Sequence, residues 1–131
     1  MWYHATVTAT VCLLALLAQP QVEADAYGVP LIKARSPILA YQELGRQHAL
    51  NRLWQMEMAR RLASGTLSEV MPEARRSDEQ VLRMAFTDEE LQAQLDLLPK
   101  AMQAVLRAYS EGVNQGIRER TEAGSLPANF Q

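Results

Sequence analysis

Among the 131 residues of this chain, the candidates for nucleophilic catalysis are the one histidine that follows residue 18 and a few serines. They are His48, Ser64, Ser68 and Ser77. A serine nucleophile needs a histidine base beside it, and an exposed strand-to-helix turn is its usual setting. None of these serines has a histidine nearby in the sequence or stands in such a turn. We therefore predict no serine triad, and we interpret His48, next to Ala49 and Leu50, as a structural residue on a helix.

Two pairs of adjacent carboxylates are the next candidates, Asp78-Glu79 and Glu89-Glu90. Acidic residues are common in the first turn of a helix, where they interact with free N–H groups. We interpret both pairs as solvated helix starts. Metal sites built on nitrogen or sulfur ligands are not expected, since His48 is the single histidine after residue 18 and Cys12 is the single cysteine. We predict no catalytic, cofactor-binding or metal-ligating residue in this chain.

The arginine pairs Arg60-Arg61 and Arg75-Arg76 could bind an acidic partner or a substrate carboxylate. We expect them to be solvated or paired within the chain, as surface arginines usually are. Trp54 and Met56 could line an apolar acyl pocket, but we predict that they pack in the core. The net charge is −2 and the basic residues are interleaved with acids, so we expect no nucleic-acid partner.

The first 18 residues resemble a secretory signal peptide. Residues 7–18 are almost wholly apolar, too short to span a bilayer as a helix, and are followed by Gln19 and Pro20. The segment before them lacks the usual Lys or Arg. Cleavage after Ala18 is favoured over cleavage after Ala24, so the mature chain begins at residue 19 or as late as residue 25. We expect a periplasmic or secreted protein with no stable membrane span and, since Cys12 is in the leader, no disulfide.

The chain after the leader predicts a strand and then a long helix. Residues 22–34 look extended, with Gly28 and Pro30 indicating an edge strand or a bend, or alternatively a tight turn. Ser36 followed by Pro37 is typical of a helix start. This helix is expected to reach Ser64, with a bend near Gly45 and a terminus at Gly65.

The second half predicts further helices joined by short connections. Residues 66–69 are expected to form a short helical turn, and residues 73–78 a charged surface loop. Thr87 and Glu90 have capping-box spacing at the start of a helix that runs to Leu98. After Pro99, another helix is expected to end near Gly124 and to place its large apolar residues on one face. These residues are Met102, Val105, Leu106, Tyr109, Val113 and Ile117.

Four sequence blocks together resemble the start of the penicillin acylase (penicillin amidase) family. They are residues 25–32, residues 51–69, residues 109–114 and residues 126–130. The resemblance extends from residue 22 to residue 131 and identifies residues 19–131 as an N-terminal fragment of an alpha chain. In itself the fragment is expected to be mainly α, with one extended strand and four or five helices. The resemblance implies that the whole family fold is α+β, an αββα sandwich.

The resemblance also implies an activity, since this family contains N-terminal nucleophile hydrolases that cleave linear amides. The family nucleophile is a Ser, Thr or Cys at the start of a second, beta chain, where the oxyanion groups are also expected. The acyl-pocket residues and calcium ligands of the first chain are expected after the block at residues 126–130. Calcium is therefore possible in the complete protein but has no expected ligand here. The implied partners are the beta chain and, for the complete enzyme, a small N-acyl amide.

Three positions depart from the family pattern. Leu31 replaces a common His, Arg46 a common Tyr, and Asn51 a common Asp, which removes a charge-assisted acceptor.

The fragment is expected to be inactive and of marginal stability alone, because its helices need an opposing apolar surface. Substrates left open are a β-lactam side-chain amide, an N-acyl homoserine lactone or another N-acyl compound. The alternative is a stand-alone exported helical binding module or a non-catalytic remnant, although a chain that ends at Gln131, inside a family block, favours a fragment.

Overall fold

The computed structural model describes residues 19–127 and residue 130. The expected signal peptide, residues 1–18 with Cys12, and the final residue Gln131 lie outside the described residues. Within the described part of the chain, no helix combines the length and the apolar character that a membrane crossing requires.

The segment predicted to be extended is an antiparallel hairpin of two short strands, β1 (Gln21–Ala24) and β2 (Pro30–Lys33). Asp25 stabilises the turn, because its Oδ1 accepts hydrogen bonds from the N–H groups of Tyr27 and Val29, both at 2.8 Å. Gly28 in this turn has φ 77°, which glycine adopts at low cost. The tight-turn alternative is therefore correct, and the segment is two strands instead of one.

The long helix α2 (Pro37–Ser64) begins and ends as predicted. Ser36 caps its start by accepting a hydrogen bond from the Leu39 N–H at 3.3 Å, and Gly65 ends it in the left-handed conformation with φ 65°. The predicted bend near Gly45 is wrong, because the non-helical backbone is at Arg52, with φ −137° and ψ 24°.

The bend at Arg52 is stabilised from the neighbouring helix. Nη1 of Arg120 donates to the Leu50 carbonyl at 2.6 Å, and Nη2 of Arg120 donates to the Ser125 carbonyl at 2.5 Å. A bend removes helical partners from nearby carbonyls, and a long cationic donor can replace them. Gly45 lies inside regular helix and has a different role, described below.

Beyond α2 come two short 3₁₀ helices, η1 (Leu67–Glu69) and η2 (Pro72–Ala74), and then α3 (Arg75–Met84) and α4 (Asp88–Leu97). The prediction of a surface loop at residues 73–78 is wrong, since Arg75 already begins α3. The helix forms here because its first turn carries Asp78, which is buried and bonded to η1. The predicted capping box of α4 is confirmed, with Thr87 and Glu90 bonded in both directions.

The last helix, α5 (Lys100–Glu122), crosses α2 at very short range. Its buried face includes Ala108, Gly112 and Gly116, which meet Gly45 and Ala49 of α2. A Cβ added to Gly112 would lie 1.8 Å from the Gln42 carbonyl oxygen, and one added to Gly45 would lie 2.1 Å from that of Tyr109. The two backbones are therefore in direct contact, which excludes larger side chains.

The predicted apolar face of α5 is consequently not its buried face. Met102 and Leu106 are exposed, while Val105, Val113 and Ile117 are only half-buried. Large side chains cannot enter a contact in which main-chain atoms touch, so they lie beside it. This correction leaves an apolar surface next to the α2–α5 crossing.

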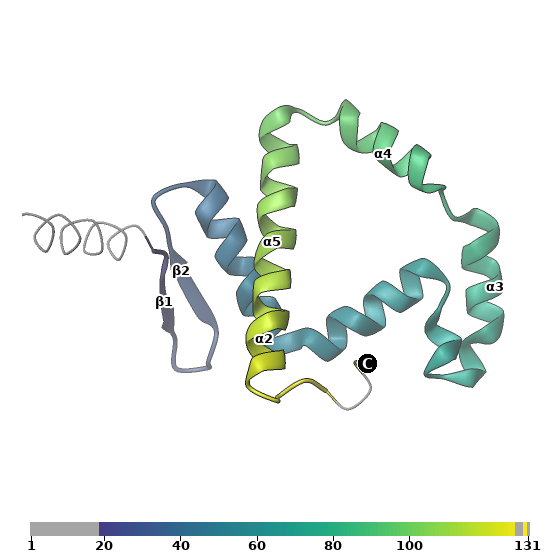
Figure 1. Ribbon diagram of the computed structural model, residues 1–131, viewed down its shortest axis with the longest axis horizontal. Helices are drawn as coiled ribbons and strands as arrows, with labels where there is room; N and C mark the ends of the chain where they lie inside the picture. The colour runs from purple at the N-terminus through teal and green to yellow at the C-terminus, as the bar shows by residue number, and fades with distance from the viewer. Residues whose placement is uncertain (1–18, 128–129, 131) are drawn as a thin grey trace, which may run out of the picture.

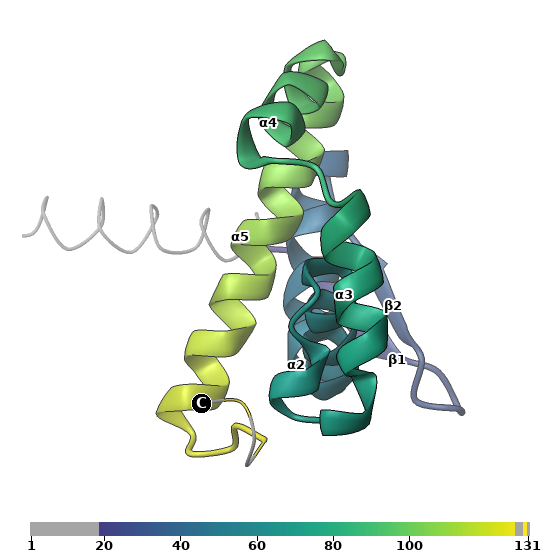
Figure 2. The ribbon, with the colours of Figure 1, turned by 90° about the vertical axis from the view of Figure 1, so that its right-hand side faces the viewer.

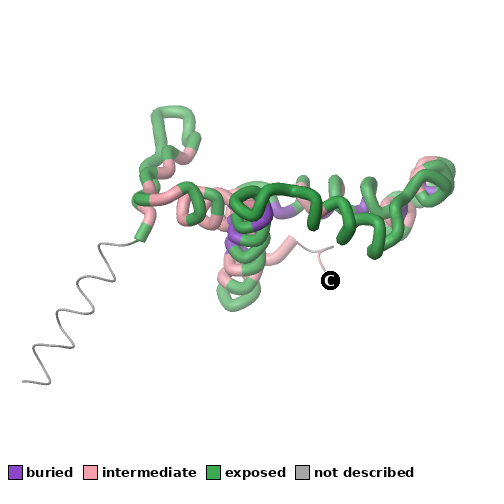
Figure 3. Tube along the Cα trace, turned by 90° about the horizontal axis from the view of Figure 1, so that it is seen from above, coloured by how far each residue is buried: buried purple, intermediate pink, exposed green. Residues whose placement is uncertain are grey.

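The four helices enclose an open frame, with the hairpin beside the start of α2 (Figure 1). Seen from the side, α3 lies in front of α2, α5 runs to the left of both, and α4 is at the top (Figure 2). Some buried residues lie where α2 crosses α5 and others lie toward the C-terminal end of α2 and in α3, whereas α4 is exposed along nearly all of its length (Figure 3). The expectation of a mainly helical fragment with a small extended segment is confirmed.

Candidate functional site

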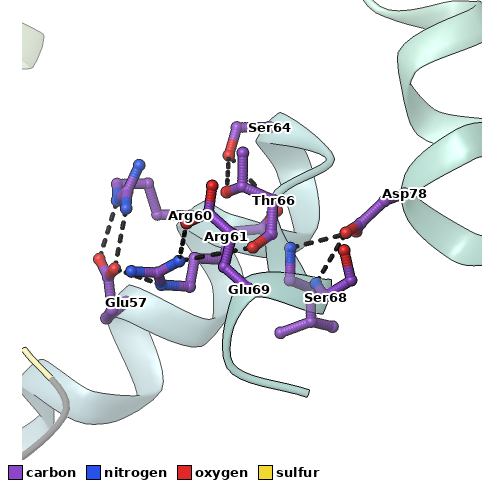
Figure 4. Close-up of polar contacts among 9 residues, drawn as sticks. Glu57, Arg60, Arg61, Ser64, Thr66, Ser68, Glu69 and Asp78 are labelled. Atoms are coloured by element: carbon purple, nitrogen blue, oxygen red, sulfur yellow. Dashed lines mark hydrogen bonds and ion pairs between the residues drawn. The ribbon is translucent and has the colours of Figure 1, made fainter. Parts of the chain in front are cut away.

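A cluster of paired charges occupies the C-terminal end of α2, within the sequence block that carries the family resemblance (Figure 4). At its centre is Glu57, which is 8 % exposed. Its carboxylate accepts hydrogen bonds from Arg60 at 2.8 Å and from Arg61 at 2.7 Å. These residues are three and four positions apart, so one helical face brings them together.

Arg61 extends the cluster from α2 to η1. Its Nη1 donates to a Glu69 carboxylate oxygen at 2.5 Å and to the Thr66 carbonyl at 3.4 Å. The guanidinium therefore joins two carboxylates and one main-chain oxygen, which uses the fork of donors that arginine provides. The result is a fixed turn after Gly65.

Asp78 reaches the same turn from α3. It is 4 % exposed, and its two oxygens accept the N–H groups of Leu67 at 3.1 Å and Ser68 at 2.7 Å. The Ser68 hydroxyl and these N–H groups hold the pKa of the Asp78 carboxyl below its usual range. Asp78 is therefore an ionised group that fixes η1, which contradicts its interpretation as a solvated helix start.

The electrostatics of the cluster favour charged, paired groups. Hydrogen bonding to Arg60 and then to Arg61 lowers the pKa of Glu57. The hydrogen bonds that Arg60 donates to Glu57 in turn raise the pKa of Arg60. A general base needs a pKa near the working pH and an open position beside a reacting atom. A carboxylate held between two arginines has neither, so Glu57 is a structural anion.

The prediction that the arginine pairs are solvated or internally paired is confirmed, since Arg76 is exposed and the other three arginines are paired within the chain. Arg60 and Arg61 bind Glu57, and the exposed Arg75 lies 3.6 Å from Glu79. At the other predicted carboxylate pair, hydrogen bonds with the main chain and with Thr87 lower the pKa of Glu89. Glu89 is exposed at the start of α4, as expected.

His48 lies far from the serines and packs against α5. Its Nδ1 is 3.0 Å from the Tyr109 hydroxyl, and the two rings meet edge to face with centroids 5.8 Å apart. Burial raises the pKa of Tyr109. Ser64 instead bonds to Thr66 and to the Arg61 carbonyl. Within residues 19–127 and 130, no hydrogen bond joins a serine to a histidine, and no three potential metal ligands gather.

An apolar groove of about 410 Å³ adjoins the charged cluster, between the second half of α2 and α5. Its apolar lining includes Leu53, Met56, Val113, Ile117 and Phe130, and Glu57 and Arg60 lie at its margin. Met56 is half-buried in this groove. Trp54 is 38 % exposed and lies near Arg120 on another side of α2, so the prediction that it packs in the core is wrong.

The three family departures have local consequences. Arg46 donates to Glu119 of α5 at 2.9 Å and to Glu43 at 2.8 Å, so it adds an ion-paired link between α2 and α5. Asn51 bonds to the Gln47 carbonyl at 2.8 Å, within its own helix. Leu31 is exposed on β2. Among the described residues, the hydrogen bonds of the neutral Asn51 side chain therefore stay within α2.

Sequence reasoning missed Glu57, Asp78, Gln103 and Arg120 as residues that join elements. The spacing of Glu57 and Arg61 by four positions could have indicated their ion pair. The spacing of Gly112 and Gly116, matched by Gly45 and Ala49, could have indicated a close helix crossing. Asp78, Gln103 and Arg120 bind main-chain atoms, which leave no signal in side-chain patterns.

Comparison with known proteins gives a consistent result. The sequence model described as penicillin amidase matches residues 19–131. Penicillin acylase 2 proenzyme of Pseudomonas sp. (strain SE83) is 38 % identical over 100 residues, 76 % of this chain and 13 % of that protein. Penicillin G acylase of Escherichia coli is 32 % identical over 93 residues, 71 % of this chain and 11 % of that protein.

A solved structure, the thermostable penicillin G acylase from Alcaligenes faecalis, matches with a TM-score of 0.73 at 33 % identity. The match covers 86 % of this chain and 60 % of that chain. This chain therefore spans only about one eighth of the length of the curated relatives that it matches.

Proposed function

This chain belongs to the penicillin amidase family, and from that premise we propose that it is the N-terminal scaffold of a hydrolase that cleaves the carbon–nitrogen bond of linear N-acyl amides. The observation that carries the proposal is the match of residues 19–131 to the family, together with the retained fold at 33 % identity. The substrate would be a β-lactam side-chain amide, an N-acyl homoserine lactone or a related compound.

The chemistry of the described residues supports a scaffolding role. The carboxylates of Glu57 and Asp78 are engaged with arginines or main-chain N–H groups. His48 is engaged with Tyr109. A nucleophilic hydrolase needs an activated nucleophile and donors for an oxyanion. We propose that both are supplied by another part of the complete enzyme, and that residues 19–131 are inactive alone.

The remaining parts of the proposal concern partners and location. The partner would be the beta chain of the complete enzyme, and its apolar surface would cover the groove lined by Met56, Val113 and Phe130. Any calcium would be bound by residues outside this chain. An export signal in residues 1–18 would direct the protein to the periplasm or the exterior.

The test is an amide-hydrolysis assay on two polypeptides. One is the complete product of the gene that encodes this chain, and the other is residues 19–131 alone, each incubated with penicillin G and with an N-acyl homoserine lactone. We expect the complete product to release the amine from at least one substrate and residues 19–131 to release none. Hydrolysis by residues 19–131 would overturn the scaffold role. A folded complete product that cleaves neither these two substrates nor other linear N-acyl amides would overturn the hydrolase and favour a helical binding module.

A further inference from the structure

The segment from α3 to α4 differs from the rest of the molecule in how it is attached. We propose that residues 75–97 form a strap that undocks from the α2–α5 pair as one unit, with Asp78 and Gln103 as the two latches that hold its ends. The proposal goes beyond the scaffold role and does not depend on it.

The first latch is Asp78. It is 4 % exposed and bonds the N–H groups of Leu67 and Ser68 in η1, which is itself bonded to α2 through Arg61 and Glu69. Both bonds of Asp78 go to main-chain donors from one carboxylate, so they form or break together. A charge-assisted bond of this kind is stronger than a neutral one and costs more when lost.

The second latch is Gln103 in the first turn of α5. It is also 4 % exposed, and its Nε2 donates to the Leu98 carbonyl at 2.9 Å and to the Asp96 carbonyl at 3.4 Å. These carbonyls lie at the C-terminal end of α4, where helical partners are missing. Gln103 thus fixes the end of the strap to α5 by means of one buried side chain.

Between the latches the strap has few packing contacts, among them the Leu82 side chain, which lies against Gly65 at the end of α2 but is still 60 % exposed. Every residue from 79 to 97 is exposed except Val81 and Leu95, which are half-buried. A groove of about 740 Å³ separates the end of α2 from the strap, lined partly by Ala63, Phe86 and Leu91. The views in Figures 1 and 2 agree that α4 lies apart from α2. Segments with few buried contacts open at lower free energy than a core does.

The test is hydrogen exchange measured by mass spectrometry on the full chain. We expect peptides from residues 79–97 to exchange at least about tenfold faster than peptides from the α2–α5 crossing, near residues 45–49 and 108–116. Equal protection of the strap and the crossing would overturn the proposal without any variant.

Two variants test the latches. Asp78→Asn should accelerate exchange in residues 66–84 by about tenfold, as expected for the loss of a hydrogen bond to a charged group, and leave residues 108–116 unchanged. The matched control is Glu79→Gln, which removes the adjacent, exposed carboxylate and should change neither region.

Gln103→Leu is the independent variant at the other end, where a side chain of similar size without donors should accelerate exchange around residues 92–98. It also keeps the proposal testable if Asp78→Asn does not fold. Unchanged exchange in these peptides, or an equal acceleration in α2 and α5, would show that Asp78 and Gln103 are ordinary core contacts and would overturn the proposal.

Discussion

The α2–α5 crossing and the strap are built on different contacts. At the crossing, Gly45 and Gly112 let main-chain atoms touch, and the surrounding residues are buried. Along residues 79–97 the side chains are exposed, and attachment depends on Asp78 and Gln103. Close packing stabilises through many small contacts that form together, whereas a latch depends on a few directional bonds. The two regions should therefore respond differently to substitution, to acid and to the replacement of an exposed apolar side chain by a polar one.

The largest effect is expected at the crossing. Gly112→Ala places a Cβ 1.8 Å from the Gln42 carbonyl oxygen, so the helices must separate. We expect a loss of about 3 kcal/mol or more in the free energy of unfolding, since overpacking against backbone cannot be relieved by a rotamer change. Thermal and denaturant unfolding followed by circular dichroism measures this loss. Ser110→Ala, an exposed change on the same helix, is the control and should be nearly neutral; a similar stability for both variants would contradict a close crossing.

A smaller effect is expected in the charged cluster at the C-terminal end of α2. Glu57→Gln retains the shape but leaves Arg60 and Arg61 without their shared anion. We expect a loss of about 2 kcal/mol in the free energy of unfolding, the usual cost of removing hydrogen bonds between charged groups. Denaturant unfolding is the measurement, and Glu79→Gln is the matched control because its pair with Arg75 is long and exposed. Equal effects of the two substitutions would show that the buried cluster adds nothing to stability.

Acid should weaken the Asp78 latch before it weakens the α2–α5 crossing. The pKa values of Asp78 and Glu57 are lowered in the folded chain, so their stabilisation is present above the unfolded-state pKa values of about 4 and is lost as the pH falls through the folded values. The crossing also contains a titrating contact, because the hydrogen bond from Arg46 lowers the pKa of Glu119, but its glycine contacts do not titrate. We therefore expect protection of residues 66–84 to fall below about pH 4 while protection of the crossing persists longer. Hydrogen exchange between pH 7 and pH 3 measures this difference. Loss of both regions at the same pH would remove the distinction between them.

The smallest effect is expected at the C-terminal end of the strap, the last residue of α4. Leu97 is 85 % exposed, so Leu97→Gln should change the free energy of unfolding by no more than about 0.5 kcal/mol and should reduce aggregation. Denaturant unfolding and light scattering at rising concentration are the measurements. A loss comparable to that of Gly112→Ala would mean that Leu97 is packed and that the strap has a core of its own.

Local sequence signals predicted the helix boundaries well. Ser36, Gly65 and the pair Thr87 and Glu90 define helix ends by bonds within a few residues, and all three predictions are confirmed. The tight turn at Gly28 is of the same kind. The failed predictions concern Arg52, Asp78 and Trp54. Their positions depend on partners that lie far away in the sequence or belong to the main chain.

The sequence by itself determined where α2, α4 and α5 begin and end, which family the chain resembles, and that its two arginine pairs would be solvated or paired within the chain. These properties follow from interactions over three or four residues, which a sequence displays directly. Only the tertiary structure decided that glycines, and not the large apolar residues of α5, form its main contact with α2. It also decided that Asp78 and Gln103 would be buried. The physical reason is that both outcomes depend on which backbone atoms approach each other across the fold, and backbone atoms are the same at every position of the sequence.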